Sequence, residues 1–175
     1  MDEWLLLLSH YGLFIVFLGA IFEGETVLVL AGILAHQGIL SLPWVVSMAA
    51  GGAVVGDQAW FLSGRFYGEQ ILQRFPKLAQ HAKKIEPVIK SKADWIAMGA
   101  RFVYGTRTVS PVLLGSHGYP GLRFLIINTC SAGIWALLGG SIGFLAGAGA
   151  KRILGDTVHV EQILLVTFMV MIFLW

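Results

Sequence analysis

The sequence predicts an all-α polytopic membrane protein with about four transmembrane helices and two opposed re-entrant helical hairpins. Of its 175 residues, 57% are apolar and 13% are charged, whereas a soluble domain carries about 25% charged residues. Long runs without Asp, Glu, Lys or Arg recur along the chain, and glycine and proline interrupt some of them. The length favours a single membrane domain over residues 1–175.

The first uncharged run, residues 4–22, predicts a transmembrane helix, because a helix needs about 20 apolar residues to cross the hydrocarbon core. A cleaved signal peptide would begin with positively charged residues. Asp2 and Glu3 precede this run instead, so we expect it to remain as a membrane span.

The second uncharged run, residues 26–56, is too long for one helix and too short for two full spans joined by a turn. Gly32, Gly38 and Pro43 interrupt it. We therefore expect a re-entrant hairpin at residues 24–41 and a span at residues 43–64. Backbone that is not helical at membrane depth must be satisfied by protein or by a water-filled cavity, so this hairpin implies a cavity.

Residues 66–94 are polar and, together with Arg65, carry seven of the twelve Lys and Arg residues of the chain. We expect an amphipathic segment that is broken at Pro76 and Pro87. The positive-inside rule places this segment in the cytoplasm. The N-terminus is then cytoplasmic as well, and the two hairpins enter the membrane from opposite sides.

Residues 95–121 are apolar again, but Arg101, Arg107 and several glycines and prolines interrupt them. This pattern predicts a second re-entrant hairpin. Arg101 and Arg107 would lie on different faces of an unbroken helix. Because Gly105 and Pro111 disfavour such a helix, we expect the tip of the hairpin to turn both side chains into one cavity.

Two further stretches predict spans, the uncharged run at residues 124–150 and the mostly apolar residues 158–175, whose span a longer natural chain would extend. The first run contains small residues with the spacing that lets membrane helices approach closely, namely Gly139, Gly143 and Gly147.

The two predicted hairpins share a pattern. Glu25-Thr26-Val27 is followed by Gly32, His36 and Gly38, and Arg107-Thr108-Val109 is followed by Gly115, His117 and Gly118. The spacings differ slightly, so chance similarity is the alternative. An inverted repeat of this kind would place a substrate near the middle of the membrane, as in secondary transporters.

Charged side chains lie at or near membrane depth at Glu23, Glu25, Asp57, Arg101 and Arg107. Because an isolated charge at a helix centre costs about 2.5–3.5 kcal/mol, they must pair or face water. We predict that the three acids form an ion-pair and proton-coupling network. The two guanidinium groups would bind substrate, since their planar donors suit phosphate or carboxylate. The alternative places both glutamates in a solvated turn at the membrane surface.

Arg65, His36 and His117 are secondary candidates. Arg65 follows Asp57 by two helical turns, but it is also placed to act as an anchor at the membrane surface. The two histidines lie near hairpin turns, where they could relay protons or cap the turns. We predict no metal site and no cofactor, because the histidines lack ligand spacing and a lone cysteine, Cys130, cannot form a cysteine-based site.

Three stretches resemble the DedA family of bacterial membrane proteins, which is related to the eukaryotic SNARE-associated Golgi (VTT-domain) proteins. They are EGETVLVLAG, GDQAWFLSGRFYG and RFVYGTRTVSPVLLG, the last of which is similar to the family's Arg-Phe-x-x-x-x-Arg-x-x-x-Pro-x-x-x-Gly signature. The resemblance covers about residues 5–150. It implies opposed re-entrant hairpins in the bacterial inner membrane and, as functional residues, Glu25, Asp57, Arg101 and Arg107.

The resemblance also implies recycling of a polyprenyl-phosphate carrier or scrambling of phospholipids, with links to the proton-motive force and to envelope-stress resistance. Many members separate the first acid from a later Pro-Gly-acid by a longer segment. Here Glu23 and Glu25 are close together without a proline, which leaves open which of them is the functional acid.

The leading hypothesis is a transporter, not an enzyme, that flips an anionic lipid headgroup and supports envelope homeostasis. Undecaprenyl phosphate is the best single candidate. Arg101 and Arg107 would hold the phosphate, and Glu25, with Glu23 or Asp57, would carry a coupling proton. Expected partners are membrane lipid and protons, with no nucleic acid, and a homo-oligomer is compatible with the sequence.

Other hypotheses are a phospholipid scramblase, a small proton-coupled cation transporter and an assembly factor that transports nothing. A lipid phosphatase is disfavoured, because GSHGYP supplies Ser116 and His117 without the Lys-Arg cluster that such enzymes need.

Overall fold

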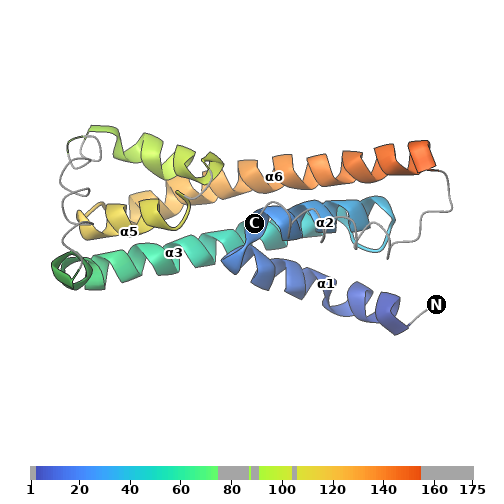
Figure 1. Cartoon of the computed structure of the whole chain (residues 1–175), viewed down its shortest axis with the longest axis horizontal. Helices are drawn as coiled ribbons and strands as arrows, with labels where there is room; N and C mark the ends of the chain where they lie inside the picture. Colours follow the sequence, from blue (N-terminus) through green and yellow to red (C-terminus); the bar gives the residue numbers. More distant parts are fainter. Residues whose placement is uncertain (1–2, 75–86, 88–90, 104–105, 155–175) are drawn as a thin grey trace. The chain divides into compact units, whose positions relative to one another are not determined.

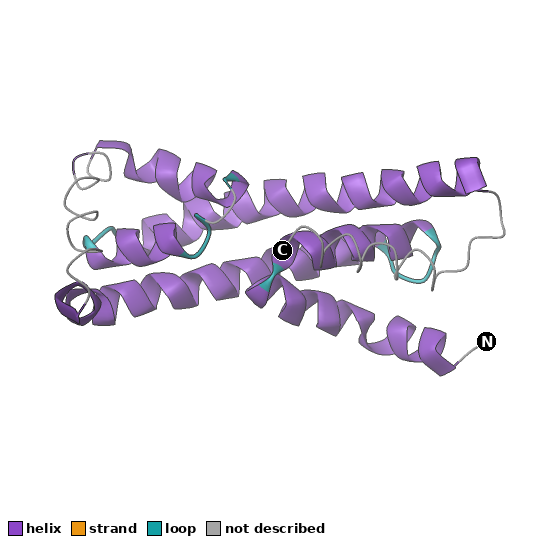
Figure 2. Ribbon diagram, viewed as in Figure 1, coloured by secondary structure: helices purple, strands orange, loops and turns teal. Residues whose placement is uncertain are grey.

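The structure is a computed structural model, and it describes residues 3–74, 87, 91–103 and 106–154. These residues form helices and turns with no strand among them (Figure 2), so the predicted all-α class is confirmed. The helices, shown in Figure 1, are α1 (Glu3–Phe22), α2 (Gly24–His36), α3 (Leu42–Arg74), a helix at residues 91–99 that continues into η1 (Ala100–Phe102), α5 (Val109–Ser116) and α6 (Gly121–Leu154).

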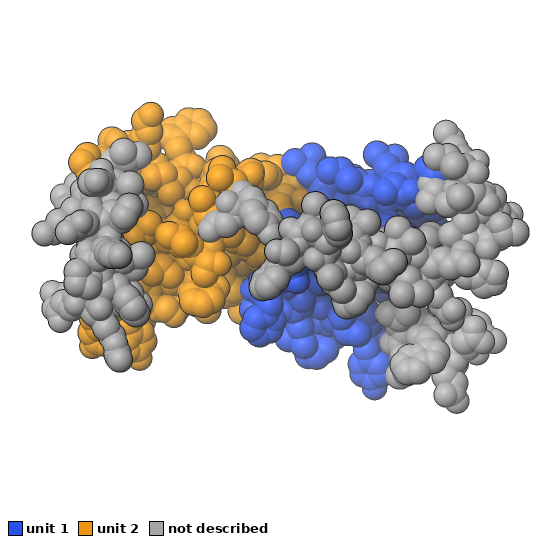
Figure 3. Space-filling view, viewed as in Figure 1, with its two compact units in different colours: residues 1–52, 136–175 blue, residues 53–135 orange. Residues whose placement is uncertain are grey.

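The structure divides into two compact units (Figure 3), and the expected single membrane domain stays a prediction. Unit 1 comprises Met1–Gly52 and Ala136–Trp175, and unit 2 comprises Ala53–Trp135. The long helices α3 and α6 contribute residues to both units.

Two of the described helices are long and apolar enough to cross a membrane. The qualifying segments are Leu42–Gly68 in α3 and Gly121–Gly149 in α6, and they include most or all of the spans expected at residues 43–64 and 124–150. The span predicted at residues 158–175 lies outside the described residues. The count of four spans and the opposed entry of the hairpins therefore stay predictions.

The helix that contains the span expected at residues 43–64 is longer than that span, because α3 continues to Arg74. Gly68 lies inside this helix, against Ser116. A Cβ at Gly68 would overlap the Ser116 side chain, so this glycine permits close packing. The start of the predicted segment 66–94 therefore belongs to α3, while residues 75–86 and 88–90 lie outside the described residues.

The first reversal of the chain also differs from the prediction. A Cβ at Gly19 would lie 2.7 Å from a methyl group of Val27, and one at Gly12 would lie 3.0 Å from Leu40, so α1 and α2 run antiparallel. The reversal occurs at Glu23, between these helices. The hairpin expected within residues 24–41 is thus wrong in its bounds, because residues 37–41 form a turn and supply no second leg.

The turns after α2 and α5 are closed by the same motif. Gly38 has a φ of +77° and Gly118 a φ of +75°, in the left-handed region that favours glycine. In each turn the glycine N–H donates to the carbonyl three residues back, and the next N–H donates to the carbonyl five residues back, all at 3.1 Å. This is a Schellman motif. In the second turn it sets the position of Tyr119.

Helix α2 packs on α6 in unit 1 in the same way as α5 packs on α3 in unit 2. In both pairs, a glycine of the short helix lies against the backbone of the long helix, and a glycine of the long helix lies against a carbonyl of the short one. The pairs are Gly32 with Gly140, Gly143 with Val29, Gly115 with Phe61, and Gly64 with Val112. This recurrence supports the predicted internal repeat.

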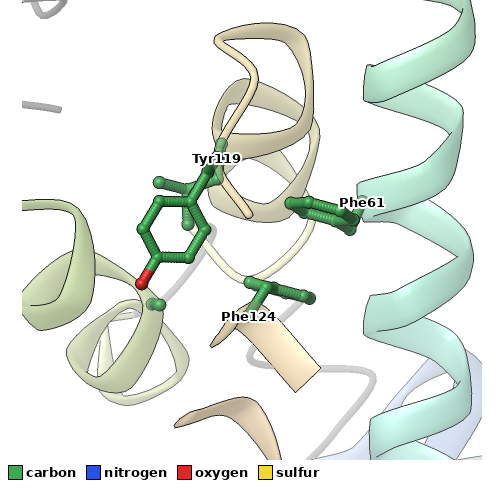
Figure 4. Close-up of a cluster of buried hydrophobic side chains, with 5 residues drawn as sticks. Phe61, Tyr119 and Phe124 are labelled. Carbon is green, nitrogen blue, oxygen red and sulfur yellow. The ribbon is translucent and has the colours of Figure 1, made fainter. Parts of the chain in front are cut away.

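An aromatic cluster forms the core of unit 2 (Figure 4). The rings of Phe61 and Phe124 stack with centroids 4.4 Å apart, and Leu114 and Ala97 are buried beside them. The ring of Tyr119 belongs to this cluster, while its hydroxyl points away from the two phenylalanines.

Candidate functional site

The candidate site is a buried ion-pair cluster in unit 2, centred on Asp57 of α3. Asp57 is only 4% exposed and Arg101 is 5% exposed. Arg101 donates a hydrogen bond to the Asp57 carboxylate, and the Nε of Arg107 lies 3.5 Å from Asp57 Oδ1. The structure thus brings together three of the five charged residues expected at membrane depth.

The backbone between the two arginines explains how side chains that are six positions apart reach one carboxylate. Arg101 lies in η1, and the chain then leaves the helix. The hydroxyl of Thr106 donates to the carbonyl of Ala100 at 2.6 Å, which ties the start of this segment to its end. A continuous helix would have separated the two guanidinium groups.

Helix α6 supplies a further wall of the site. Arg101 donates to Asn128 Oδ1 at 2.9 Å, and Ser131 donates to the carbonyl of Met98 at 2.7 Å. The guanidinium carbons of Arg101 and Arg107 lie 5.4 Å and 5.5 Å from the centroid of the Trp135 ring, a distance at which a cation is attracted to the ring.

The sequence analysis missed these residues of α6. Asn128, Ser131 and Trp135 lie at spacings of three and four, which places them on one helix face. An asparagine within a long uncharged run was the available signal, because a polar side chain at membrane depth needs a partner.

The cluster is closed in this structure. The space lined by Asp57, Arg101, Arg107, Ser110 and Asn128 has a volume of about 10 Å³, which is room for about one water molecule. A phosphate group cannot enter without movement of the surrounding helices. Because each of these charges would be costly alone, the pairing with Asp57 stabilises the closed arrangement.

Comparison with known proteins identifies the family. The VTT domain matches residues 14–145. The chain belongs to the VTT-domain family, and the resemblance to DedA proteins is confirmed. All the cluster residues named above lie within the VTT domain.

The chain is similar to bacterial membrane proteins. It is 38% identical to the inner membrane protein YohD of Escherichia coli over 141 residues, which are 81% of this chain and 73% of YohD. It is 30% identical to the uncharacterized membrane protein slr0232 of Synechocystis, over 90% of this chain and 74% of the relative. The inner membrane protein YqjA of Escherichia coli is 24% identical, over 73% of this chain and 60% of YqjA. No solved structure matches the chain.

Glu23 and Glu25 lie in unit 1. Glu23 joins α1 to α2, and Glu25 lies in the first turn of α2. Both side chains are exposed, and a carboxylate is favourable at a helix N-terminus. Their predicted pairing with Arg101 and Arg107 stays a prediction.

The secondary candidates occupy structural positions. Arg65 is exposed and donates to the carbonyl of Tyr119 at 2.9 Å. The Nδ1 of His117 lies 2.8 Å from the carbonyl oxygen of Leu113, and since a carbonyl can only accept, Nδ1 is the donor. His36 packs edge-on against Phe144 in unit 1, with ring centroids 4.9 Å apart.

A second polar cluster of unit 2 lies at the start of α6. Tyr119 donates a hydrogen bond to Asp94, and Arg123 donates to the other oxygen of Asp94 at 2.5 Å. The hydrogen bond from Tyr119 lowers the pKa of Asp94, and Arg123 lowers it further. Burial, together with the hydrogen bond and negative charge of Asp94, raises the pKa of Tyr119 from 10.0 to about 12.

We expect Asp94→Asn to lower the pKa of Tyr119 from about 12, although the burial of the ring keeps it above the ordinary value. Because the raised pKa favours the neutral phenol in the folded protein, the associated stability is present below pH 10 and is lost as the pH rises through about 12. Ultraviolet absorbance of the phenolate, measured as the difference from a Tyr119→Phe variant, reports this titration. An unchanged midpoint in Asp94→Asn would show that the two side chains are not in contact.

Proposed function

We propose that this VTT-domain protein moves a lipid with an anionic phosphate headgroup across the bacterial inner membrane, with undecaprenyl phosphate as the best candidate. The names of YohD and YqjA support the location. The observation that carries the proposal is the convergence of two guanidinium groups on one buried carboxylate, Asp57.

The chemistry of this cluster favours an anion. Two guanidinium groups present about ten N–H donors, whereas one carboxylate offers about four acceptor positions. The acceptor positions of Asp57 are therefore fewer than the N–H donors of Arg101 and Arg107. A phosphate group has more acceptor oxygens and suits the planar donors of arginine, so it can replace the carboxylate between them.

Competition between Asp57 and phosphate provides a transport cycle. With Asp57 ionised, its pairing with both arginines keeps the site closed to about 10 Å³. Protonation of Asp57 would release the guanidinium groups and allow η1 and α5 to move and admit the headgroup. Glu25 and Glu23 remain candidates for a second proton carrier, since both are exposed carboxylates.

A cation transporter is less well supported. Its acids would have to be available as cation ligands, but Asp57 is engaged by Arg101 and Arg107. A scramblase would share the phosphate site but would need no proton gradient.

Reconstitution tests the proposal. Liposomes containing the protein and a labelled undecaprenyl phosphate should show accelerated movement of the label, and the double variant Arg101→Gln/Arg107→Gln should abolish it. Arg65→Gln is the matched control, because it removes one exposed arginine from the same unit. Equal loss in the control, or full activity of the double variant, would exclude the arginine pair as the phosphate site.

The same liposomes with an imposed pH gradient distinguish a coupled transporter from a scramblase. Gradient-dependent movement supports coupling, and Glu25→Gln should then bind lipid but lose the response to the gradient. If this variant keeps its full pH dependence, Asp57 or Glu23 carries the proton.

A further inference from the structure

A polar cleft in unit 2 lies outside the buried cluster. It has a volume of about 430 Å³, and its lining includes Lys92, Asp94, Trp95, His117, Tyr119 and Arg123. It is therefore far larger than the closed space of about 10 Å³ around Asp57. The cleft can admit a headgroup in the conformation described here.

The cleft lies where a membrane surface is expected. Arg123 is in the first turn of the span Gly121–Gly149. Trp95 is 75% exposed, and tryptophan is enriched where membrane meets water. A lipid that lies in the membrane could thus present its headgroup to this cleft.

The side chains of the cleft suit a phosphate. Lys92 and Arg123 supply positive charge, and Tyr119 supplies a hydroxyl donor whose pKa of about 12 keeps it protonated at neutral pH. His117 uses Nδ1 to close its own turn, which leaves Nε2 as its second polar atom. Phosphate accepts strong charge-assisted hydrogen bonds from groups of this kind.

Asp94 competes with such a ligand. It accepts hydrogen bonds from Tyr119 and Arg123, and the Asp94–Arg123 pair is solvent-exposed, with side chains 43% and 61% accessible. Exposed ion pairs contribute little to stability. A phosphate group can therefore replace Asp94 as the partner of Arg123 at a small cost in free energy.

The cleft and the buried cluster share structural elements. The helical stretch that carries Asp94 continues to Arg101, seven positions on, which corresponds to roughly 10 Å along a helix. The aromatic cluster of Phe61, Tyr119 and Phe124 belongs to the same unit (Figure 4). Tyr119 contributes its ring to that cluster and its hydroxyl to the cleft.

We infer that this cleft is a docking site for the phosphate monoester headgroup of a membrane lipid, held by Lys92 and Arg123 before the headgroup reaches Arg101 and Arg107. This inference rests on the proposed function. It assigns the first contact with the substrate to residues that are separate from the buried cluster.

Calorimetric titration of the full chain in uncharged detergent micelles tests the inference, with hexyl phosphate as the probe. Arg123→Gln and Lys92→Gln should each weaken binding about tenfold, the effect of losing one charge-assisted hydrogen bond. Arg123→Lys should retain more affinity than Arg123→Gln. Asp94→Asn should tighten binding several-fold, because it removes the competitor for Arg123, and a misfolded variant cannot produce such a gain.

Control variants distinguish specific binding at the cleft from general electrostatic attraction between the protein and the probe. Arg65→Gln removes one exposed positive charge of unit 2 that does not line the cleft, and it should leave the affinity unchanged. If it weakens binding as much as Arg123→Gln, or if Arg123→Gln binds like the wild type, the inference is overturned. Inorganic phosphate should bind more weakly than hexyl phosphate, and equal affinity would overturn the lipid assignment in favour of free phosphate.

The two proposals fail in different ways. The double variant Arg101→Gln/Arg107→Gln should still bind hexyl phosphate at the cleft, even though it should not transport. If that variant loses transport while Arg123→Gln binds hexyl phosphate like the wild type, the buried cluster is supported as a phosphate site and the cleft is excluded as a docking site.

Discussion

Asp57→Asn should destabilise the protein by about 3–5 kcal/mol, the cost of removing one member of a buried ion pair. The substitution leaves the guanidinium groups of Arg101 and Arg107 close together without the carboxylate that they share. Arg101→Gln should have an effect of similar size, because it leaves a carboxylate that is 4% exposed without its hydrogen-bonded partner. Thermal or denaturant unfolding in detergent micelles measures both.

The double variant Asp57→Asn/Arg101→Gln should lose clearly less than the sum of the single losses, since neither buried charge of the pair then remains. Asp94→Asn is the matched control, because it removes an acid that is solvent-exposed in the same unit. It should change the stability far less. Additive losses in the double-mutant cycle would mean that Asp57 and Arg101 are not coupled.

Gly64→Ala and Gly115→Ala should also be strongly destabilising. A Cβ at Gly64 would overlap the carbonyl oxygen of Val112, and a Cβ at Gly115 would overlap that of Phe61. Backbone cannot rotate away as a side chain does, so each variant must separate α3 from α5. The expected loss is at or above the range of about 1–3 kcal/mol for overpacked cores.

Gly133→Ala provides the control for these substitutions. Gly133 lies in α6, and no atom lies within 4 Å of a Cβ built at this position. Alanine should therefore stabilise the helix by about 0.5–1 kcal/mol relative to glycine. The same unfolding measurements apply, and equal effects at Gly133 and Gly64 would contradict the close packing of α3 and α5.

Separation of α3 from α5 should also impair function, because α3 carries Asp57 and α5 begins two residues after Arg107. The glycines that permit close packing therefore support the buried charge cluster.

The all-α class and the approximate positions of the helices followed from the sequence. Runs without charge have to be helical in a membrane, because each backbone N–H and C=O needs a partner there. The cost of buried charge likewise singled out five charged residues, of which the structure brings Asp57, Arg101 and Arg107 together and leaves Glu23 and Glu25 exposed. These conclusions depend on composition and local spacing, which the sequence contains in full.

The errors arose where packing overrides local preference. Gly68 is a weak helix former in isolation, yet it lies inside α3, against Ser116. The chain reverses at Glu23, between α1 and α2, whereas the interruptions at Gly32, Gly38 and Pro43 favoured a hairpin within residues 24–41. Contacts between distant segments decide such boundaries, and a single sequence does not contain them.

The sequence by itself determined which residues could not remain alone at membrane depth, because the penalty for an unpaired charge depends on the residue type and the medium. Only the tertiary structure decided which partners they found. Asp57 pairs with both arginines. From α6, Asn128 and Trp135 complete this cluster. In the second cluster, Tyr119 donates a hydrogen bond to Asp94. These partners are separated by tens of positions in the chain, so only the packing of the helices of unit 2 brings them into contact.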